Sequence, residues 1–375
     1  MPHPLAETLA ERYPRVAIAH EWLTIPGGSE KVVVALLDLL PQAELLTTVY
    51  DPEGGWPRAL TDRPVHPSRL DRIPGARTHY PKLLPLMDHA FRSFDVSRYD
   101  LVVSSNHACA KNVRTHDRAG RDVRHVCYCH TPMRYIWDPS FLEGEQLGRV
   151  GGAVLKAAIP RLRRTDLRGA AQVDTFVANS SFVAERIRTT YGRASTVVHP
   201  PVEVERFLDR PRAPEDFYLV FGRLVPYKKA DVAVAACELL GRDVVVAGTG
   251  RDLPRVEAVA GPRTTFAGRV SDDEVASLFS RARALLFPGL EDFGIVPVEA
   301  QAAGLPVIAY GKGGACDSVV DGETGVLYDD PSPAGLAAAI ERFEALELSQ
   351  ARLRDHARGF APEVFLRRMG EVLAA

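Results

Sequence analysis

The alternation of short β-branched runs with helix-patterned stretches is the feature that most limits how this chain can fold. Runs such as "RVAIAH", "DLVVSSN" and "RHVCYCH" are bounded by turn residues and separated by apolar-patterned stretches such as "SEKVVVALLDLL". Strands that alternate with helices in this way build a parallel sheet with helices on both faces. After "RPRAPEDF" the alternation starts again with "YLVFGRL" and continues to "TGVLYD". The sequence therefore predicts an α/β protein with two doubly wound domains.

The length of the chain and one short segment set the predicted domains. At 375 residues the chain is longer than one hydrophobic core normally supports. The proline-rich, charged segment 208–216 is the predicted linker between an N-terminal domain, 1–207, and a C-terminal domain, 217–358; the remainder, 359–375, is helix-like. Ligands of doubly wound domains bind beyond the carboxyl ends of the strands. We therefore expect two Rossmann-like domains that face each other across a cleft.

Charge and cysteine content exclude some classes of function. The chain has 46 basic and 48 acidic side chains, so no net field favours a nucleic-acid partner. Its five cysteines are odd in number and scattered, which argues against a disulfide framework. No apolar run approaches the length of a membrane span, and the N-terminal stretch lacks a signal peptide's apolar core. We therefore expect a cytoplasmic protein.

A basic and apolar segment at 148–171 leaves two interpretations open. Its sequence, "GRVGGAVLKAAIPRLRRTDLRGAA", can lie against an anionic membrane surface, which would make the protein peripheral at the inner face of the membrane. The same segment can instead line an acceptor site or pack between helices.

Several loops that follow predicted strands have the composition of a phosphate site. Gly27 and Gly28 precede a helix that Ser29 can cap, so they form either a phosphate cradle at a helix N-terminus or a tight turn. Arg223 and Lys228 follow the first strand of the second domain. These two cations either neutralise a diphosphate without a metal ion or are solvated surface charges.

Two further loops of the second domain extend this pattern. Gly248 ends the strand "VVVAGTG" and opens another glycine loop. Arg269 and Val270 end the strand "FAGRV", where their backbone groups can bind a nucleotide base. The alternative is that this stretch only begins a helix, because Ser271 and Glu274 have the spacing of a capping box.

Two glutamates, Glu291 and Glu299, lie eight positions apart in "EDFGIVPVEAQAAGLPVIA". Carboxylates accept hydrogen bonds from vicinal hydroxyls, so one can bind a sugar and the other the ribose of a nucleotide. A general acid and base pair is a second interpretation. A third is that both are solvated carboxylates near a helix start.

These motifs together resemble the retaining, nucleotide-sugar-dependent glycosyltransferases of family 4, which have the GT-B fold of two Rossmann-like domains. The resemblance rests on "HEWLTIPGGSEKV", "GRLVPYKK", "VAGTG", "FAGRVSDDEV", the stretch with the two glutamates, and "DSVVDGETGVLY". It covers nearly the whole chain and is weakest at 50–95 and 140–165. It also implies that the helix at 359–375 crosses back to the N-terminal domain.

The resemblance implies a role for each of these positions. Arg223 and Lys228 are similar to the family's donor-diphosphate contacts, with backbone donors from the loop of Gly27 and Gly28. Glu299 matches the residue that binds the ribose hydroxyls. Other roles concern the transferred sugar: Glu291 is expected to bind its hydroxyls, and backbone groups of Phe293, Gly294 and Ile295 complete the sugar and phosphate pocket.

The block "CYCHTPMRYIWD" of the first domain contains another candidate site residue, the histidine His130. His130 matches the place where the family often has a histidine facing the transferred sugar, although a histidine at a strand end is commonly structural. Arg134, Tyr135 and Asp138 are candidates for the acceptor side. His107, after a neighbouring strand, is another residue that can reach the cleft.

The resemblance predicts a retaining hexosyltransferase that moves mannose from GDP-mannose to a hydroxyl of a glycan, glycolipid or small molecule, as in bacterial O-antigen and exopolysaccharide synthesis. His130, Arg223, Lys228 and Glu291 are the predicted catalytic residues. The chain has no Asp-x-Asp motif, so we expect no metal ion and no other cofactor. The alternatives are a UDP-sugar-dependent transferase of the same fold, a phosphorylase-like enzyme that uses pyridoxal phosphate, a sugar-nucleotide epimerase and a non-catalytic sugar-nucleotide sensor.

Overall fold

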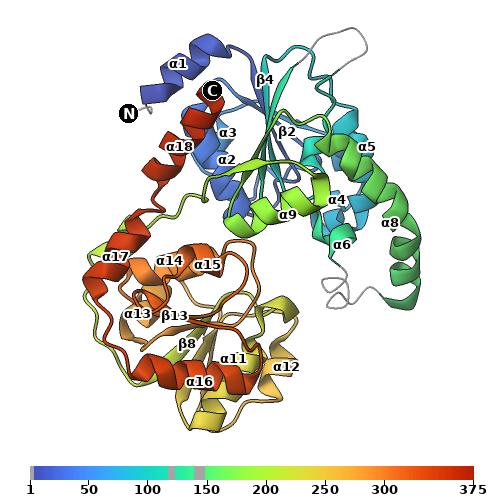
Figure 1. The fold of residues 1–375 in the computed structure, drawn as a ribbon. Helices are drawn as coiled ribbons and strands as arrows, with labels where there is room; N and C mark the ends of the chain where they lie inside the picture. Colours follow the sequence, from blue (N-terminus) through green and yellow to red (C-terminus); the bar gives the residue numbers. More distant parts are fainter. Residues whose placement is uncertain (1–3, 117–122, 139–147) are drawn as a thin grey trace. The chain divides into compact units, whose positions relative to one another are not determined.

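The computed structural model describes residues 4–116, 123–138 and 148–375, with side chains described except at Pro4 and at 148–155. The chain forms two compact units, one of Met1–Pro201 with Glu363–Ala375 and one of Val202–Pro362 (Figure 1). The segment 208–216, which the sequence predicts as a linker, lies in the second unit. The backbone N–H groups of Ala213 and Glu215 donate to carbonyl oxygens of Ser280 and Arg281 in that unit. The division therefore lies before this segment.

Unit 1 is built on a seven-stranded parallel sheet in the order β3-β2-β1-β4-β5-β6-β7. The strands are β1 Val16–His20, β2 Glu44–Thr47, β3 Val65–Pro67, β4 Leu101–Asn106, β5 Arg124–Cys129, β6 Thr175–Ala178 and β7 Ser195–Val197. The strand order reverses beside β1, whose two neighbours are β2 and β4. A crevice at the carboxyl ends of β1 and β4 is where such sheets bind ligands.

Helices cover both faces of this sheet because its strands are buried on both sides. Val16 and Ile18 of β1 pack into one apolar cluster, whereas Ala17 and Ala19 pack into another. The α-helices of unit 1 are α1 Pro4–Arg12, α2 Gly28–Leu39, α3 Arg58–Thr61, α4 Ala76–His79, α5 Leu84–Arg92, α6 Arg134–Trp137, α8 Gly148–Ala170, α9 Ser181–Tyr191 and α18 Pro362–Ala374. Short 3₁₀ helices are η1 Arg69–Arg72, η2 Tyr80–Leu83 and η3 Ala110–Asn112.

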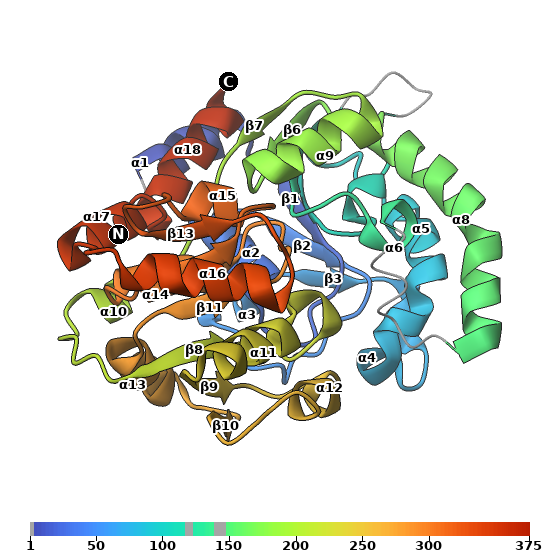
Figure 2. The same ribbon diagram turned by 60° about the horizontal axis from the view of Figure 1, so that its bottom comes forward.

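The C-terminal helix α18 belongs to unit 1, although the chain reaches it from unit 2. Phe365, Met369 and Leu373 of α18 are buried in the same cluster as β1 and α2. Gly370 lies against the side chain of Leu5, so α18 runs beside α1 (Figures 1 and 2). Burial of three large apolar side chains at about 2 kcal/mol each gives this docking a large apolar contribution.

Unit 2 has a six-stranded parallel sheet in the order β10-β9-β8-β11-β12-β13. The strands are β8 Phe217–Phe221, β9 Asp243–Ala247, β10 Thr264–Gly268, β11 Leu285–Phe287, β12 Val307–Tyr310 and β13 Gly325–Tyr328. The order reverses between β8 and β11. Both units therefore have the doubly wound topology, which confirms the predicted fold class of two Rossmann-like units.

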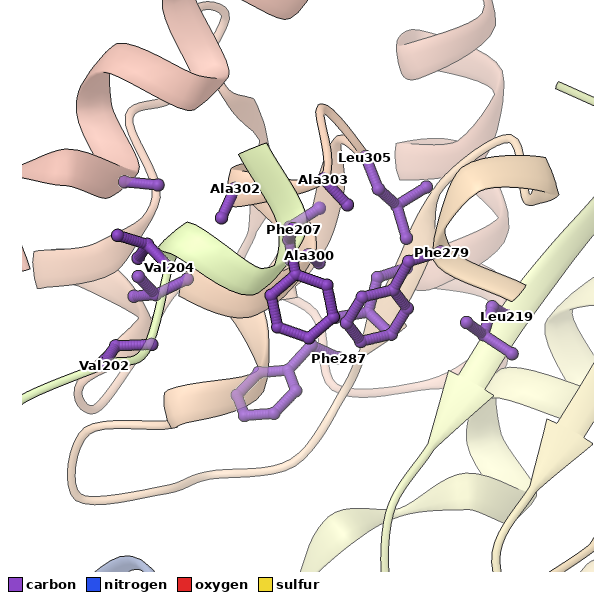
Figure 3. Packing of buried hydrophobic residues seen from close by; sticks show 14 of the residues in the cluster. Val202, Val204, Phe207, Leu219, Phe279, Phe287, Ala300, Ala302, Ala303 and Leu305 are labelled. Atoms are coloured by element: carbon purple, nitrogen blue, oxygen red, sulfur yellow. The ribbon is translucent and has the colours of Figure 1, made fainter. Parts of the chain in front are cut away.

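The helices of unit 2 also divide between the two faces of its sheet. They are α10 Glu205–Leu208, α11 Ala230–Leu240, α12 Leu253–Glu257, α13 Asp272–Arg281, α14 Ile295–Ala302, α15 Ala315–Ser318, α16 Pro333–Glu344 and α17 Gln350–Arg358, with the 3₁₀ helix η4 Pro226–Lys228. Figure 3 shows the core under α10 and α13, where the rings of Phe207 and Phe279 lie 5.5 Å apart between centroids. Burial of Phe207 and Leu208 in this core holds the start of the predicted linker on unit 2.

No helix among the described residues combines the length and the apolar character needed to cross a membrane. The helix α8 covers all but the last residue of the segment 148–171, and its side chains are described from Lys156 onward.

Candidate functional site

Unit 2 brings a cation and a carboxylate together where its strand order reverses. Lys228 lies in the loop after β8 and Glu291 in the loop after β11, and their Nζ and Oε1 atoms are 3.0 Å apart. Both side chains are 18% exposed, so the pair is accessible from solvent on one side. Burial acts to lower the pKa of Lys228, but the charge of Glu291, the interaction with Tyr227 and the hydrogen bond to Glu291 together outweigh it, and the pKa is raised. The site therefore has a stable ammonium group.

Arg223 lies in the same loop and lines a small cavity with this pair. The cavity has a volume of about 20 Å³, and its lining includes Gly222, Arg223, Lys228, Gly289 and Glu291. Arg223 itself is exposed to solvent. The predicted donor residues Arg223, Lys228 and Glu291 are thus brought together by the structure.

Glycines let the loops of this edge pack backbone against backbone. Gly248 has a φ of 141°, and a Cβ there would lie 1.9 Å from the carbonyl oxygen of Gly222. No side chain fits at that distance, and the conformation itself favours glycine. The predicted glycine loop after β9 therefore lies directly against the loop that carries Arg223.

The start of α14 leaves backbone donors without a side-chain cap. Gly294 is the N-cap residue, with a φ of 82°, and the first turn contains no acidic residue. The first N–H groups of a helix have no partner within it and favour an anion. Phe293 is buried beneath this turn, Ile295 begins the helix, and Glu299 is half-buried further along it. The contact of these backbone groups with a sugar or a phosphate stays a prediction.

The predicted base site at the end of β10 has a helix cap of its own. Ser271 accepts a hydrogen bond from the backbone of Glu274, and Glu274 Oε2 accepts one from the backbone of Ser271 at 2.6 Å. The capping box expected from the sequence is therefore confirmed. Arg269 is exposed and Val270 packs against the core of unit 2. Their contact with a base stays a prediction.

In unit 1, the helix after β1 begins two residues earlier than the capping pattern suggests. Gly27 is the N-cap of α2 and Gly28 is its first residue. Ser29, which the sequence predicts as the cap, lies inside the first turn and donates from Oγ to Glu30 Oε2 at 3.0 Å. A Cβ at Gly27 would lie 2.9 Å from the same oxygen. The position of Glu30 therefore favours glycine here.

A buried chain of hydrogen bonds runs from Glu30 to the predicted site residue His130. His20 Nε2 is 3.1 Å from Glu30 Oε1, and His20 Nδ1 is 3.2 Å from Ser105 Oγ. Ser105 Oγ is in turn 2.8 Å from His130 Nε2. His20 ends β1, Ser105 lies in β4 and His130 follows β5, so the three strands bring these side chains together.

The charges along this chain follow from its geometry. Burial opposes the charged form of His20, but the hydrogen bond to Glu30 and the charges of Glu30 and Glu21 together outweigh burial and raise the pKa of the imidazole. Burial would likewise raise the pKa of Glu30, yet the same bond, together with the charges of His20 and His107, lowers it to about 2. Burial, with the charges of neighbouring histidines, lowers the pKa of His130 to about 3. Charged His20 donates to Ser105, Ser105 donates to His130 Nε2, and the neutral ring of His130 has its proton on Nδ1.

Glu21 shapes the loop that carries the other histidine candidate, His107. Its Oε1 accepts hydrogen bonds from four backbone N–H groups, at 2.8 to 3.2 Å: those of His107, Ala108, Cys109 and Ala110. Its Oε2 lies 3.5 Å from His107 Nδ1. Burial acts to raise the pKa of Glu21, but the histidines and backbone donors together lower it. The rings of His107 and His130 are 6.3 Å apart between centroids.

Sequence reasoning missed four members of this buried cluster: His20, Glu21, Glu30 and Ser105. The signal for His20, Glu21 and Ser105 is polar residues at the ends of two apolar strands, "AIAHE" and "VVSSN". Glu30 lies in the first turn of α2 and has no such signal. The acceptor candidates Arg134 and Tyr135 lie in α6. Asp138 follows that helix, with one carboxylate oxygen 3.9 Å from Arg186.

In the described ranges 4–116, 123–138 and 148–375, no group of three His, Cys, Asp or Glu side chains is placed to hold a metal ion.

Two family models match the chain in tandem. The model described as Glycosyltransferase Family 4 matches residues 26–206, and the model described as Glycosyl transferases group 1 matches residues 202–360. The chain belongs to the family 4 glycosyltransferases. This confirms the resemblance seen in the sequence, and the two matches divide the chain near the boundary between the units.

Curated relatives of this glycosyltransferase are similar over part of their length. A D-inositol 3-phosphate glycosyltransferase of Geodermatophilus obscurus is 33% identical over 52% of this chain and 50% of its own. A GDP-mannose-dependent alpha-(1-6)-phosphatidylinositol monomannoside mannosyltransferase of Mycobacterium tuberculosis is 31% identical over 51% of this chain and 57% of its own. The glycosyltransferase thus matches about half the length of these curated relatives.

Solved structures share the fold of this glycosyltransferase over nearly the whole chain. The Anabaena protein HepE, in complex with UDP, has a TM-score of 0.68 at 17% identity and covers 96% of this chain and 99% of its own. Sucrose-phosphate synthase of Thermosynechococcus elongatus has a TM-score of 0.70 at 18% identity, with 96% and 98% covered. At these identities the likeness shows the GT-B fold.

Proposed function

We propose that this chain is a retaining hexosyltransferase that moves mannose from GDP-mannose to an acceptor hydroxyl of a glycan, a glycolipid or a small molecule. The observation that carries the proposal is the cluster of Lys228, Glu291 and Arg223 beside the uncapped start of α14. Cations and helix N–H groups are suited to a diphosphate, and a nearby carboxylate is suited to sugar hydroxyls.

In the proposed reaction, the diphosphate is the leaving group. Arg223 and Lys228 neutralise the charge that develops on its oxygens, with help from the N–H groups of Gly294 and Ile295. Stabilisation of a leaving group by fixed cations requires no metal ion, and we propose that none is used. The acceptor hydroxyl attacks the face from which the diphosphate leaves, through an oxocarbenium-like state, so the anomeric configuration is retained.

The remaining site residues are assigned to binding the donor. Glu291 accepts hydrogen bonds from hydroxyls of the transferred sugar and Glu299 from the ribose. Gly248, with the backbone of Arg269 and Val270, adjoins the nucleotide. In unit 1, Gly27 and Gly28 supply backbone donors to the phosphates.

His130 is proposed to contact the transferred sugar. Its protonated Nδ1 would be the donor, because Nε2 accepts from Ser105. We infer GDP rather than UDP as the nucleotide, because the similar mannosyltransferase of Mycobacterium tuberculosis is named as GDP-mannose-dependent.

The protein is proposed to work in the cytoplasm, where glycan precursors and nucleotide sugars are available. All five cysteines are free, which is compatible with a reducing compartment. A lipid-linked acceptor would bring the protein to the inner face of the membrane.

The experiment that tests the donor assignment is calorimetric titration of GDP, UDP and ADP into the purified protein. We expect selective binding of GDP that weakens about tenfold or more in Glu299→Ala, since a charge-assisted hydrogen bond is lost. Glu341→Ala, which removes an exposed glutamate from α16 of the same unit, is the matched control and should bind as the wild type does. A preference for UDP would overturn the GDP assignment, and failure to bind any nucleotide would overturn the transferase proposal.

A metal requirement is tested separately. Mannosyl transfer measured with and without EDTA should have the same rate, because Arg223 and Lys228 supply the positive charge. Loss of turnover on chelation, restored by added magnesium, would contradict the metal-free reaction.

A further inference from the structure

An arginine-lined cavity of unit 1 lies between α5 and α8 and shares no lining residue with the histidine cluster. It has a volume of about 810 Å³. The two helices run beside each other in both views (Figures 1 and 2). Five arginines line the cavity: Arg92, Arg114, Arg161, Arg164 and Arg168. The only carboxylate among the residues that line it is Asp88, so the cavity has a strong excess of positive charge.

The arginines of the cavity are left largely without acidic partners. Asp88 lies 4.0 Å from Arg92. No ion pair with a carboxylate of the described residues involves the other four, Arg114, Arg161, Arg164 and Arg168. Three of these lie on α8 at helical spacing, so their guanidinium groups share one face. Like charges held together repel one another and favour the binding of an anion.

Buried contacts fix the walls of the cavity. Asn112 Nδ2 donates to Asp88 Oδ1 at 2.8 Å, which ties η3 to α5. A Cβ at Gly169 would collide with Asn112, so α8 approaches η3 as closely as a glycine allows. Buried Lys111 and Asp166 form an ion pair between η3 and α8, and Asp166 also accepts from Trp137 Nε1 at 2.7 Å. The arginines are therefore presented by a rigid frame.

The cavity also has an apolar part. Pro85 and Leu86 of α5 and Ala158 and Leu162 of α8 line it, and Leu86 is 51% exposed. Arginine forks bind phosphate oxygens in pairs. An apolar wall beside them accommodates hydrocarbon attached to the phosphate. The combination is suited to an amphiphile rather than to a free inorganic anion.

We propose that this cavity binds the phosphate headgroup of an anionic lipid and so attaches the protein to a membrane surface. The site is separate from the donor residues of unit 2. Its occupation requires no glycosyl transfer, so its test can fail or succeed independently of the proposed function.

The test is co-sedimentation of the full chain with phosphatidylcholine vesicles that contain or lack phosphatidylglycerol. We expect binding only to the anionic vesicles. Arg161→Gln with Arg164→Gln should weaken the binding about thirtyfold, because each basic residue near an anionic surface contributes about a fivefold preference. The matched control is Arg58→Gln with Arg69→Gln, two exposed arginines of unit 1 that do not line the cavity. This control should bind as the wild type does.

A second double variant distinguishes a specific phosphate site from general electrostatic attraction to the anionic vesicles. Arg161→Lys with Arg164→Lys keeps both charges but removes both forks, and we expect a smaller but measurable loss of vesicle binding. Circular dichroism melting of each variant checks that the fold is retained.

Three results would overturn the proposal. Equal losses in the two glutamine pairs would reduce it to general surface charge, and absence of binding to anionic vesicles would remove the lipid. Cavity-dependent binding of soluble glycerol 3-phosphate without vesicle binding would show a phosphate site whose ligand is not a membrane lipid.

Discussion

The two units have the same doubly wound topology, but the polar residues at their reversal points are organised differently. In unit 1, His20, Glu30 and Ser105 are buried and satisfy one another in a hydrogen-bonded chain that ends at His130. In unit 2, Lys228 and Glu291 are partly exposed, and uncapped N–H groups begin α14 beside them. The comparison indicates that the sheet edge of unit 1 holds the side chain of His130 in place, whereas the sheet edge of unit 2 leaves charged groups accessible to a ligand.

Removal of a cation from the unit 2 site should have the largest effect. Lys228→Ala is expected to lower kcat for mannosyl transfer by about 10²–10³, as for the loss of one preorganised group that stabilises developing charge. GDP release in the presence of an acceptor measures the rate. Lys312→Ala, which removes an exposed lysine of the same unit, should leave kcat unchanged, and an equal fall in both variants would deny Lys228 a special role.

Gly248→Ala should break the loop packing on which the unit 2 site depends. The new Cβ would meet the carbonyl oxygen of Gly222 and force a φ that alanine disfavours, so we expect destabilisation of about 3 kcal/mol. Gly322→Ala also occupies a positive φ but meets no atom within 4 Å. It should cost only about 1 kcal/mol. Urea unfolding of the two variants compares the costs, and equal values would show that backbone conformation alone, not close packing, selects glycine at 248.

Ser105→Ala should expose the structural nature of the unit 1 chain. It removes the hydroxyl that joins His20 and His130. His20 Nδ1 keeps the carbonyl oxygen of residue 105 at 3.2 Å, whereas His130 Nε2 loses its partner, and an unsatisfied buried group costs about 1–3 kcal/mol. We expect a lower free energy of unfolding by urea, with GDP affinity unchanged. Ser277→Ala removes an exposed hydroxyl from α13 and should have little effect. Wild-type stability in Ser105→Ala would contradict the proposed chain.

The acid response should be the smallest of these effects. The pKa of His130 falls from 6.5 to about 3 in the folded protein, so between these values the unfolded state binds more protons and stability falls as the pH falls. The pKa of Glu30 is lowered from 4.5 to about 2, so this carboxylate adds stability that is lost as the pH falls from 4.5 to about 2. His20 acts in the opposite direction, because its raised pKa gives stability that is lost at higher pH.

His130→Gln is expected to flatten the acid response between pH 6.5 and 3, because it removes the titrating group. Urea midpoints of the variant and the wild type at pH 7 and pH 5 measure the difference. If the urea midpoint falls between pH 7 and pH 5 by the same amount in the variant as in the wild type, His130 is not held neutral in the folded protein.

Much of the fold and of the unit 2 site could be predicted from the sequence, because their determinants are local. Apolar runs and glycines mark each strand and the loop after it, which placed Arg223, Lys228 and Glu291 at one sheet edge. The chain through His20 and Ser105 depends on the pairing of β1 with β4, which are 85 residues apart at His20 and Ser105. Nothing local in the sequence specifies that pairing.

The division between the units shows a second limit. Prolines and charges at 208–216 have the composition of a linker, yet Phe207 and Leu208 are buried in the core of unit 2. Arg212 also donates to the carbonyl oxygen of Ala282 at 2.8 Å. Composition indicates a loop, whereas the partners of that loop depend on tertiary packing.

The measurement that tests the central claim most directly is calorimetric binding of GDP and of guanosine to the wild type and to Lys228→Ala. If the unit 2 cluster is a diphosphate site, GDP should bind at least about tenfold more tightly than guanosine in the wild type. Lys228→Ala should weaken GDP and leave guanosine unchanged. Equal affinities for GDP and guanosine, or GDP binding that is indifferent to Lys228, would contradict the account.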